Sequence, residues 1–438
     1  MAAQFQFPIV GLPLLPGRRL IAVDAGSHAI KIILAERSGS SVRILRRELI
    51  DLQDEGLLSS EEIGPAVTAV LSSMGDYPVV LALPQHLTFS HILDLTSGSQ
   101  AVKQMIEAET RKNRDLRDSP VVYDFARLHP FGRHQNAFLV TLCKENDILA
   151  QIARLALVQE DVIEVVASAN VLATGYQSLS PSTGHVALVD IGASGTMVSL
   201  CLNGQVVHTA NFPIGGNLFT ETLATATNTT PEAAEASRQT TNLFAGLDRV
   251  EALASVVNSW KMELKRAIDG WLFENPELKL PLSSFRVVLT GGGSQQPGLI
   301  EFLNDDPELR FELWRSGSGK HTVPASFAVV YGAAAQALGV GGQSASLLPA
   351  DLRDHWRKQR VHQRILAGVA GVLMLTMILL GYGTWAKHSA AREKERLVNQ
   401  AKFALEKAEE IAALRQQLIA DYDRIRPVLR KGQRTLDT

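Results

Sequence analysis

The segment VDAGSHAIK, residues 23–31, decides how the N-terminal part of the chain folds. An apolar run that ends at Val23 leads into Asp24, Gly26 permits a tight turn, and a second apolar run from Ile30 returns. This pattern predicts a β-hairpin whose tip is large enough to receive a phosphate group.

The same arrangement recurs in VDIGASGT, residues 189–196. Apolar residues lead to Asp190, glycines and hydroxyl side chains follow, and an apolar run over residues 198–202 returns. The recurrence predicts an internal repeat of strand, aspartate, glycine turn and strand. A third segment, VLTGGGSQQPG at residues 288–298, predicts a strand that enters a glycine loop of the kind a ligand approaches closely.

Together the three segments predict a nucleotide site between two lobes. Glycines let successive backbone N–H groups reach phosphate oxygens, and Lys31 adds a positive charge. Asp24 and Asp190, which come from different hairpins, can hold Mg²⁺ through its water ligands. The glycines and hydroxyl residues that the pattern assigns to this site are Gly26, Ser27, Gly192, Ser194, Gly195, Thr196, Gly291, Gly292 and Gly293. Each motif alone is weak, since such hairpins are usually ordinary turns; their order carries the prediction.

This order resembles that of the actin, Hsp70 and sugar-kinase superfamily, which has two phosphate motifs followed by an adenosine motif. Within it, residues 20–338 resemble the PilM family, the cytoplasmic actin-like component of type IV pilus machines, and more distantly FtsA. LALPQHLTFSHILDL at residues 81–95, PVVYDF at 120–125 and FPIGGNLFTETLA at 212–224 carry the resemblance. It implies an α/β, two-lobed, actin-like ATPase domain over residues 20–340.

The resemblance also implies further nucleotide contacts. PEAAEASR, residues 231–238, resembles the family's A-E-x-x-K helix, whose glutamate and lysine approach the ribose and base. Glu235 matches, and Arg238 replaces the lysine while it keeps the charge. Gly215 and Gly216 lie where the family places backbone near the phosphates.

Simpler interpretations stay open for three of these residues. Glu235 and Arg238 can be a solvated i,i+3 pair on a helix surface. Lys31 can be a surface residue of its strand. His28, in the turn between phosphate-type residues, is expected to be exposed and without a catalytic role.

A second signal is the run ILAGVAGVLMLTMILLGYGTWA, residues 365–386, which contains no charged residue. Its length suits a helix that crosses the hydrocarbon core, so we predict a transmembrane helix. The flanking charges are nearly balanced, and the orientation is inferred from the nucleotide site: the N-terminal domain cytoplasmic, the C-terminal tail periplasmic, in a bacterial inner membrane. Residues 1–19 lack a signal-peptide pattern and are expected to be a flexible extension.

The segment SLLPADLRDHWRKQR at residues 346–360, within a predicted juxtamembrane region of residues 341–364, resembles the start of the PilN family. That family opens with an N-L-L-P peptide that docks on PilM, followed by a basic stretch, a membrane helix and a periplasmic coiled coil. Leu347, Leu348 and Pro349 match this peptide, and Ser346 replaces the asparagine. The alternative is a plain linker. After the span, apolar residues spaced by three or four over residues 387–438 predict a coiled coil with a stutter near Ile411.

The resemblance therefore implies an assembly platform subunit of a type IV pilus or related secretion machine, with ATP and Mg²⁺ as cofactors and hydrolysis slow or absent. The implied partners are PilN- and PilO-like inner-membrane proteins through the coiled coil, motor or platform proteins in the cytoplasm, and further copies of the chain. A GspL-like type II secretion scaffold without nucleotide binding, and a membrane-tethered ATPase or kinase, are the alternatives. The net charge of −2, without clustered basic and aromatic residues, argues against nucleic-acid binding.

Overall fold

The computed structural model describes residues 19–53, 60–94, 99–112, 116, 119–180, 183–314, 322–341 and 345–434. The predicted extension at residues 1–19 lies outside them except for Arg19, as do residues 435–438 of the predicted coiled coil. The described chain divides into two units, one that ends at Val361 and one that begins at His362.

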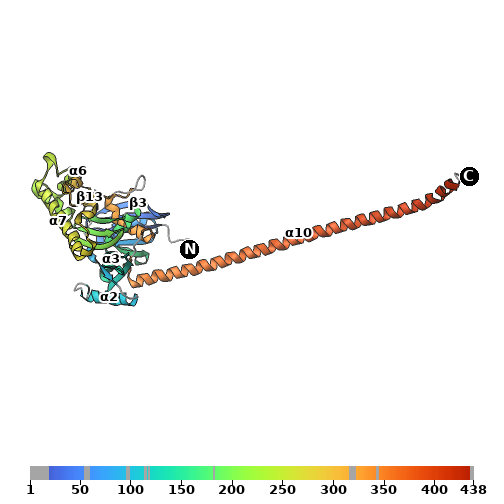
Figure 1. Ribbon diagram of the computed structural model, residues 1–438, viewed down its shortest axis with the longest axis horizontal. Coiled ribbons are helices and arrows are strands. Elements are labelled where there is room, and N and C mark those ends of the chain that lie inside the picture. The colour runs from blue at the N-terminus through green and yellow to red at the C-terminus, as the bar shows by residue number, and fades with distance from the viewer. Residues whose placement is uncertain are drawn as a thin grey trace, which may run out of the picture. The chain divides into compact units, whose positions relative to one another are not determined.

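Two five-stranded sheets with equivalent strand orders form the frame of the first unit (Figure 1). In each sheet three consecutive strands form an antiparallel meander, and two later strands extend it in parallel. The first sheet, in spatial order, contains β3 (Ser41–Asp51), β2 (Ala29–Ser38), β1 (Arg19–Ala25), β4 (Val79–Leu83) and β8 (Val162–Ala167). The second contains β11 (Gln205–Phe212), β10 (Thr196–Leu202), β9 (His185–Ile191), β12 (Arg286–Thr290) and β13 (Arg310–Leu313). The predicted internal repeat is confirmed, because the β1–β2 and β9–β10 hairpins hold equivalent positions.

A smaller antiparallel sheet lies beside the first large one. It contains β5 (Thr88–Asp94), β7 (Ala137–Lys144) and β6 (Val121–Arg127) in spatial order, with α2 (Ser99–Lys112) in the same region of the chain. Ile106 of α2 is buried against Val140 and Leu142 of β7, so the helix covers this sheet.

Helices cover both faces of the first large sheet. On one face, α1 (Ser60–Met74) and α3 (Glu145–Arg154) bury apolar side chains against β1. On the other face, α4 (Ser168–Leu179) and α9 (Ala328–Ala337) pack against each other between the two large sheets; α9 contacts β1 and β4 of the first sheet, and α4 contacts β10 and β11 of the second. The remaining helices of this unit are α5 (Gly216–Thr227), α6 (Pro231–Thr240), α7 (Glu251–Glu274) and α8 (Leu299–Leu303). Since β1 and β4 are covered on both sides, their sequences are continuous apolar runs rather than alternating ones.

Two glycines let α4 and α9 approach closely. A Cβ atom at Gly332 of α9 would lie 1.9 Å from the carbonyl oxygen of Val171, and one at Gly175 of α4 would lie 2.9 Å from the Cα atom of Gly332. A side chain at either position would force the helices apart. The spacing of the two large sheets therefore depends on these glycines.

Residues 345–356, which we call the docked peptide, pack on the edge of the first large sheet. The backbone N–H of Leu347 donates to the Val165 carbonyl of β8 at 2.7 Å, and the Trp356 indole donates to the Val162 carbonyl at 2.9 Å. The backbone N–H of Ser346 donates to a carboxylate oxygen of Asp124 in β6 at 2.7 Å. Leu347 and Leu348 are 0% and 3% exposed and join the apolar cluster beneath α1 and α3. The segment is therefore an integral part of the first unit, not a plain linker.

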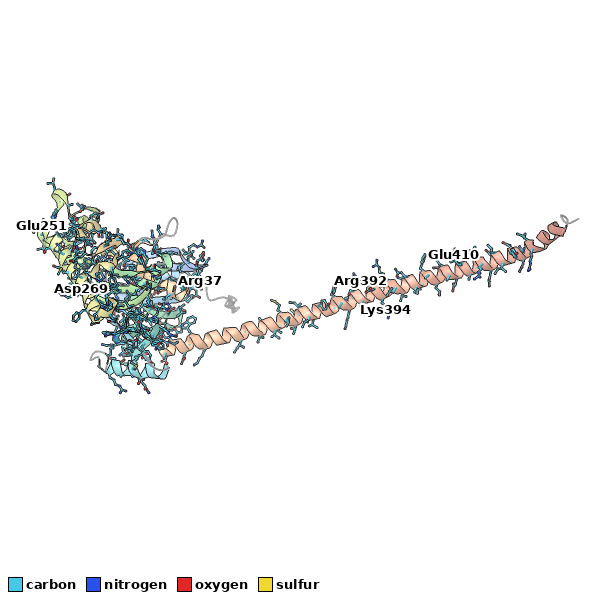
Figure 2. All side chains as sticks on the ribbon, viewed as in Figure 1. Arg37, Glu251, Asp269, Arg392, Lys394 and Glu410 are labelled. Carbon is cyan, nitrogen blue, oxygen red and sulfur yellow. The ribbon has the colours of Figure 1, made fainter. Side chains whose placement is uncertain are left out.

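The second unit is the C-terminal part of α10 (Ala350–Arg434), which Figure 1 shows as a continuous helix. Its stretch Gly368–Arg426 contains an 18-residue window of mean hydropathy 1.7, none of it buried, which is long and apolar enough to cross a membrane. Beyond this window, charged side chains such as Arg392, Lys394 and Glu410 project from the helix (Figure 2).

The apolar stripe on this helix is broader than the sequence pattern predicts. Leu397, Ala404, Ile411, Leu418 and Ile425 repeat every seventh residue and are exposed. In most repeats the next residue is also apolar and exposed, and these neighbours are Val398, Leu405, Ala412 and Ile419. A stripe this wide suits more than one neighbouring helix.

We expect Gly332→Ala to lower the free energy of unfolding by about 1–3 kcal/mol, since the added methyl group must push α4 and α9 apart. Gly270→Ala on α7 is the matched control, because a Cβ there meets nothing within 4 Å. The free energy of unfolding of that variant should rise by about 0.5–1 kcal/mol, because alanine has a higher helix propensity than glycine. Urea unfolding of the full-length chain in detergent measures the free energy of unfolding of both variants. Equal changes in Gly332→Ala and Gly270→Ala would contradict the close contact between α4 and α9.

Candidate functional site

A cavity of about 570 Å³ lies where the tips of the β1–β2 and β9–β10 hairpins meet α5 and α6. Its volume is typical of a site for a small organic ligand. Nine of the residues predicted from the sequence line it: Ser27, Lys31, Gly192, Ser194, Gly216, Glu235, Arg238, Gly292 and Gly293. The three glycine segments, far apart in sequence, therefore meet at one cavity.

The two hairpin tips are in direct contact. The Ser27 hydroxyl, at the tip of β1–β2, donates a hydrogen bond of 3.0 Å to the Ser194 hydroxyl, at the tip of β9–β10. A single ligand in the cavity can therefore contact both halves of the repeat.

Asp24 and Lys31 face each other across the first hairpin. They are register partners in the β1–β2 pair, and the Lys31 ammonium lies 3.4 Å from a carboxylate oxygen of Asp24. Burial lowers the pKa of Lys31, but the charges of Asp24 and Asp190 outweigh this effect and hold the pKa above its usual value. Lys31 is thus a charged group of the cavity wall, and not a surface residue of its strand.

Asp190 ends the equivalent strand of the second sheet. Thr290, its register partner in β12, donates a hydrogen bond of 2.9 Å to its carboxylate. Burial, together with the charge of Asp24, raises the pKa of Asp190 in spite of Lys31 and Thr290. The described residues contain no group of three or more His, Cys, Asp or Glu side chains that could hold a metal. A cation beside Asp24 and Asp190 would therefore depend on water and on its ligand's oxygens.

The second hairpin also holds the start of α5. The backbone N–H groups of Gly216 and Asn217 donate to the carbonyls of Gly192 and Ala193 at 2.8 and 2.9 Å. A Cβ at Gly215 would lie 2.5 Å from the Gly195 nitrogen, so Gly215 serves this close packing and does not line the cavity. The amides at the start of α5 are already engaged by the hairpin.

The third glycine segment packs against the end of β9. Gly291 has a φ of +84°, and a Cβ there would lie 2.4 Å from the Ile191 carbonyl oxygen. A Cβ at Gly293 would lie 2.5 Å from the Ile191 side chain, whereas Gly292 has open space. The predicted loop continues into a short 3₁₀ helix, Gly292–Gln295. Gly291 therefore sets the turn, while Gly292 and Gly293 reach the cavity.

Glu235 and Arg238 are not a solvated pair. Arg238 is 5% exposed, and its guanidinium donates to both carboxylate oxygens of Glu235 at 2.7 and 2.8 Å. Thr220 and Gln239 donate to the same carboxylate. Burial raises the pKa of Glu235, but the hydrogen bonds from Arg238 and Thr220 outweigh it and leave the pKa below its usual value. The pair is a fixed ionic group in the wall formed by α5 and α6.

The cavity lining does not include seven of the predicted residues: Asp24, Gly26, Asp190, Gly195, Thr196, Gly215 and Gly291. Thr196 requires a correction, because its hydroxyl is not free to bind a phosphate. It donates to the Ile214 carbonyl at 2.6 Å and accepts from the Trp260 indole at 2.8 Å, and the residue is 2% exposed. Its role is to connect β10 with α7.

The expectation that His28 is exposed also requires correction. His28 is partly buried and lines the cavity, with its Nε2 atom 3.3 Å from a carboxylate oxygen of Asp51 at the end of β3. Sequence reasoning missed Asp51 and other lining residues of α5, α6 and the segment before α9, among them Asn217, Thr220, Gln239 and Ser326. The register of β3 against β2, which pairs Ala29 with Asp51, is the signal that could have found Asp51.

The duplicated sheets and the cavity between their hairpins define an actin-like ATPase fold. A family model described as type IV pilus assembly protein PilM matches residues 22–314. The chain belongs to this family.

The chain is similar to several individual proteins. A solved PilM–PilN type IV pilus biogenesis complex has a TM-score of 0.58 and 20% identity, and the match covers 74% of this chain and 99% of that one. MreB5 of Spiroplasma citri bound to AMPPNP has a TM-score of 0.42 and 13% identity, over 72% of this chain and 94% of that one. The cell division protein FtsA of Neisseria meningitidis serogroup B is 31% identical over 137 residues, 27% of this chain. This match spans only 33% of the FtsA length.

We expect Arg238→Met to lower the free energy of unfolding by about 1–3 kcal/mol at pH 7, because Glu235 loses its main ionic partner. The pKa of Glu235 is lower in the folded protein than the value of about 4.5 in the unfolded chain. The ion pair with Arg238 therefore stabilises the fold fully above pH 4.5, and this stabilisation is lost as the pH falls through the folded-state pKa. The difference in free energy of unfolding between Arg238→Met and the unmodified chain should therefore become smaller below pH 4.5. Urea unfolding at several pH values measures it.

Arg249→Met is the matched control, because Arg249 forms an exposed pair with Glu251. The change in free energy of unfolding caused by Arg249→Met should stay below about 1 kcal/mol at every pH. A similar, pH-independent loss in both variants would contradict the role of the Glu235 carboxylate.

Proposed function

We propose that this protein is an inner-membrane assembly subunit of a type IV pilus or related secretion machine, and that it binds ATP between its two lobes. The observation that carries the proposal is the cavity at the contact of the two hairpins, with Lys31 in its wall and the Lys31 ammonium 3.4 Å from a carboxylate oxygen of Asp24. Ligand binding there would fix the relative angle of the lobes. Family membership supports the assembly role.

The proposed ligand fits the chemistry of the wall. Ser27 and Lys31 suit phosphate oxygens, since they supply a hydroxyl and an ammonium donor, and the open space at Gly292 lets a ligand approach the backbone there. Glu235 and Arg238, at the α6 side, are the groups proposed to lie near the ribose and base. Asp24 and Asp190 would hold Mg²⁺ through water, and the ion would neutralise phosphate charge. We expect slow hydrolysis or none.

The remaining parts of the proposal concern the membrane and partners. We infer that residues 365–386 span the bacterial inner membrane, with the nucleotide domain in the cytoplasm and residues 387–438 in the periplasm. The broad apolar stripe of α10 supports PilN- or PilO-like helices as partners, and the docked peptide supports a PilN-like role for the segment that precedes the span. A change in lobe angle would then reach periplasmic partners through the membrane helix.

The test of nucleotide binding is a calorimetric titration of Mg-ATP into the full-length protein in detergent, with released phosphate measured in the same sample. We expect binding with little phosphate release, and Asp24→Ala should abolish binding because one of the two carboxylates that hold the hydrated cation is lost. Asp269→Ala on α7, which Figure 2 labels, is the control and should bind as the unmodified chain does.

Undiminished affinity of Asp24→Ala would remove the site assignment. Absence of ATP binding by the unmodified chain would favour a scaffold without nucleotide, and rapid phosphate release would favour an active ATPase.

The topology has a separate test. A reporter enzyme that is active only in the periplasm, fused after Thr438, should be active because the tail lies outside the inner membrane. The same reporter fused after residue 361, before the span, should be silent. An inactive C-terminal fusion that is present at normal levels in the membrane would overturn the orientation.

A further inference from the structure

The charged groups next to the cavity are arranged around Lys31. Asp24 belongs to the first large sheet and Asp190 to the second, so the two carboxylates come from different lobes. The Lys31 ammonium lies 3.4 Å from Asp24, and the side chains of Lys31 and Asp24 are only 17% and 11% exposed. Lys31 lines the cavity, whereas neither aspartate does. Of these three charged groups, Lys31 is the one that reaches the cavity.

Two neighbouring carboxylates in a partly buried site need a compensating charge. Left unpaired they repel each other, and removal from water penalises each charge further. Arg238 cannot supply the charge, because its guanidinium is bound to Glu235. The ammonium of Lys31, 3.4 Å from a carboxylate oxygen of Asp24, supplies it.

We propose that Lys31 is the resident counter-ion of Asp24 and Asp190 when the site holds no nucleotide, and that it keeps free divalent cations out. This inference rests on the proposed nucleotide function, in which the same carboxylates hold a hydrated Mg²⁺. An ammonium and a metal ion with its water shell would compete for the same carboxylate oxygens.

With Lys31 as counter-ion, the site would bind a metal only together with its nucleotide. The flexible four-carbon stem of lysine lets its head group move without a change in the backbone. When a metal nucleotide enters, Lys31 exchanges the carboxylates for phosphate oxygens, which carry more negative charge. Asp24 and Asp190, released by Lys31, would then be free to hold the hydrated metal. A free cation brings no phosphate, so it would have to displace Lys31 without offering it a new partner.

The test measures metal binding without any nucleotide. Mn²⁺ is titrated into the nucleotide-free, full-length protein in detergent, and the electron paramagnetic resonance signal of free Mn²⁺ reports how much is bound. We expect weak binding by the unmodified chain. Lys31→Met removes the ammonium and keeps the apolar stem, so Mn²⁺ should bind about tenfold more tightly or better. The double variant Lys31→Met with Asp190→Asn should lose this gain.

Two further variants keep the test decisive. Lys402→Met on α10, an exposed lysine remote in sequence from the cavity residues, should leave Mn²⁺ binding as in the unmodified chain. Lys31→Gln keeps a polar head group without charge and should show the same gain as Lys31→Met, which covers the case that Lys31→Met does not fold.

Unchanged or weaker Mn²⁺ binding by the folded Lys31 variants would overturn the proposal, as would a gain that persists in the double variant. Because no nucleotide is present, this result is separate from the proposed function. A gain in Mn²⁺ affinity together with no ATP binding would support the counter-ion role and reject the nucleotide site.

Discussion

The close contact between α4 and α9 is the constraint on which the rest of the first unit depends. These helices lie between the two large sheets, and Gly175 and Gly332 let their backbones meet without intervening side chains. The β1–β2 and β9–β10 hairpins belong to different sheets, so the helix spacing helps to set the distance between the hairpin tips. At this spacing the Ser27 and Ser194 hydroxyls are in contact. The cavity is thus a product of packing far from its own wall.

The polar groups around the cavity are largely paired with one another. Lys31 contacts Asp24, Ser27 contacts Ser194, Arg238 contacts Glu235, and the first amides of α5 contact the second hairpin. The Lys31–Asp24 and Arg238–Glu235 pairs avoid the cost of a buried group without a partner, whereas the two serines are exposed. A ligand must therefore exchange existing interactions for new ones, and its net affinity reflects the difference between the two sets.

Much of the fold could be predicted from the sequence because its signals are local. A strand, an aspartate, a glycine turn and a returning strand occupy adjacent positions in the chain, so both hairpins and the repeat were recognisable. Thr196 was misassigned because its partners, Ile214 and Trp260, are distant in sequence. His28 and Asp51 meet only through the register of β2 and β3. The burial of Arg238 likewise depends on tertiary packing, which a helical i,i+3 spacing does not reveal.

The docked peptide has a consequence for stoichiometry. Leu347 and Leu348 fill their apolar site on the first sheet from the same chain that builds the site, so docking is a unimolecular event. Its occupancy does not fall on dilution, in contrast to a peptide supplied by a separate protein. Every copy of the chain carries one site and one peptide in equal number, whatever the expression level of any partner. A competing peptide would have to overcome this local excess before it could bind at the same edge of β8.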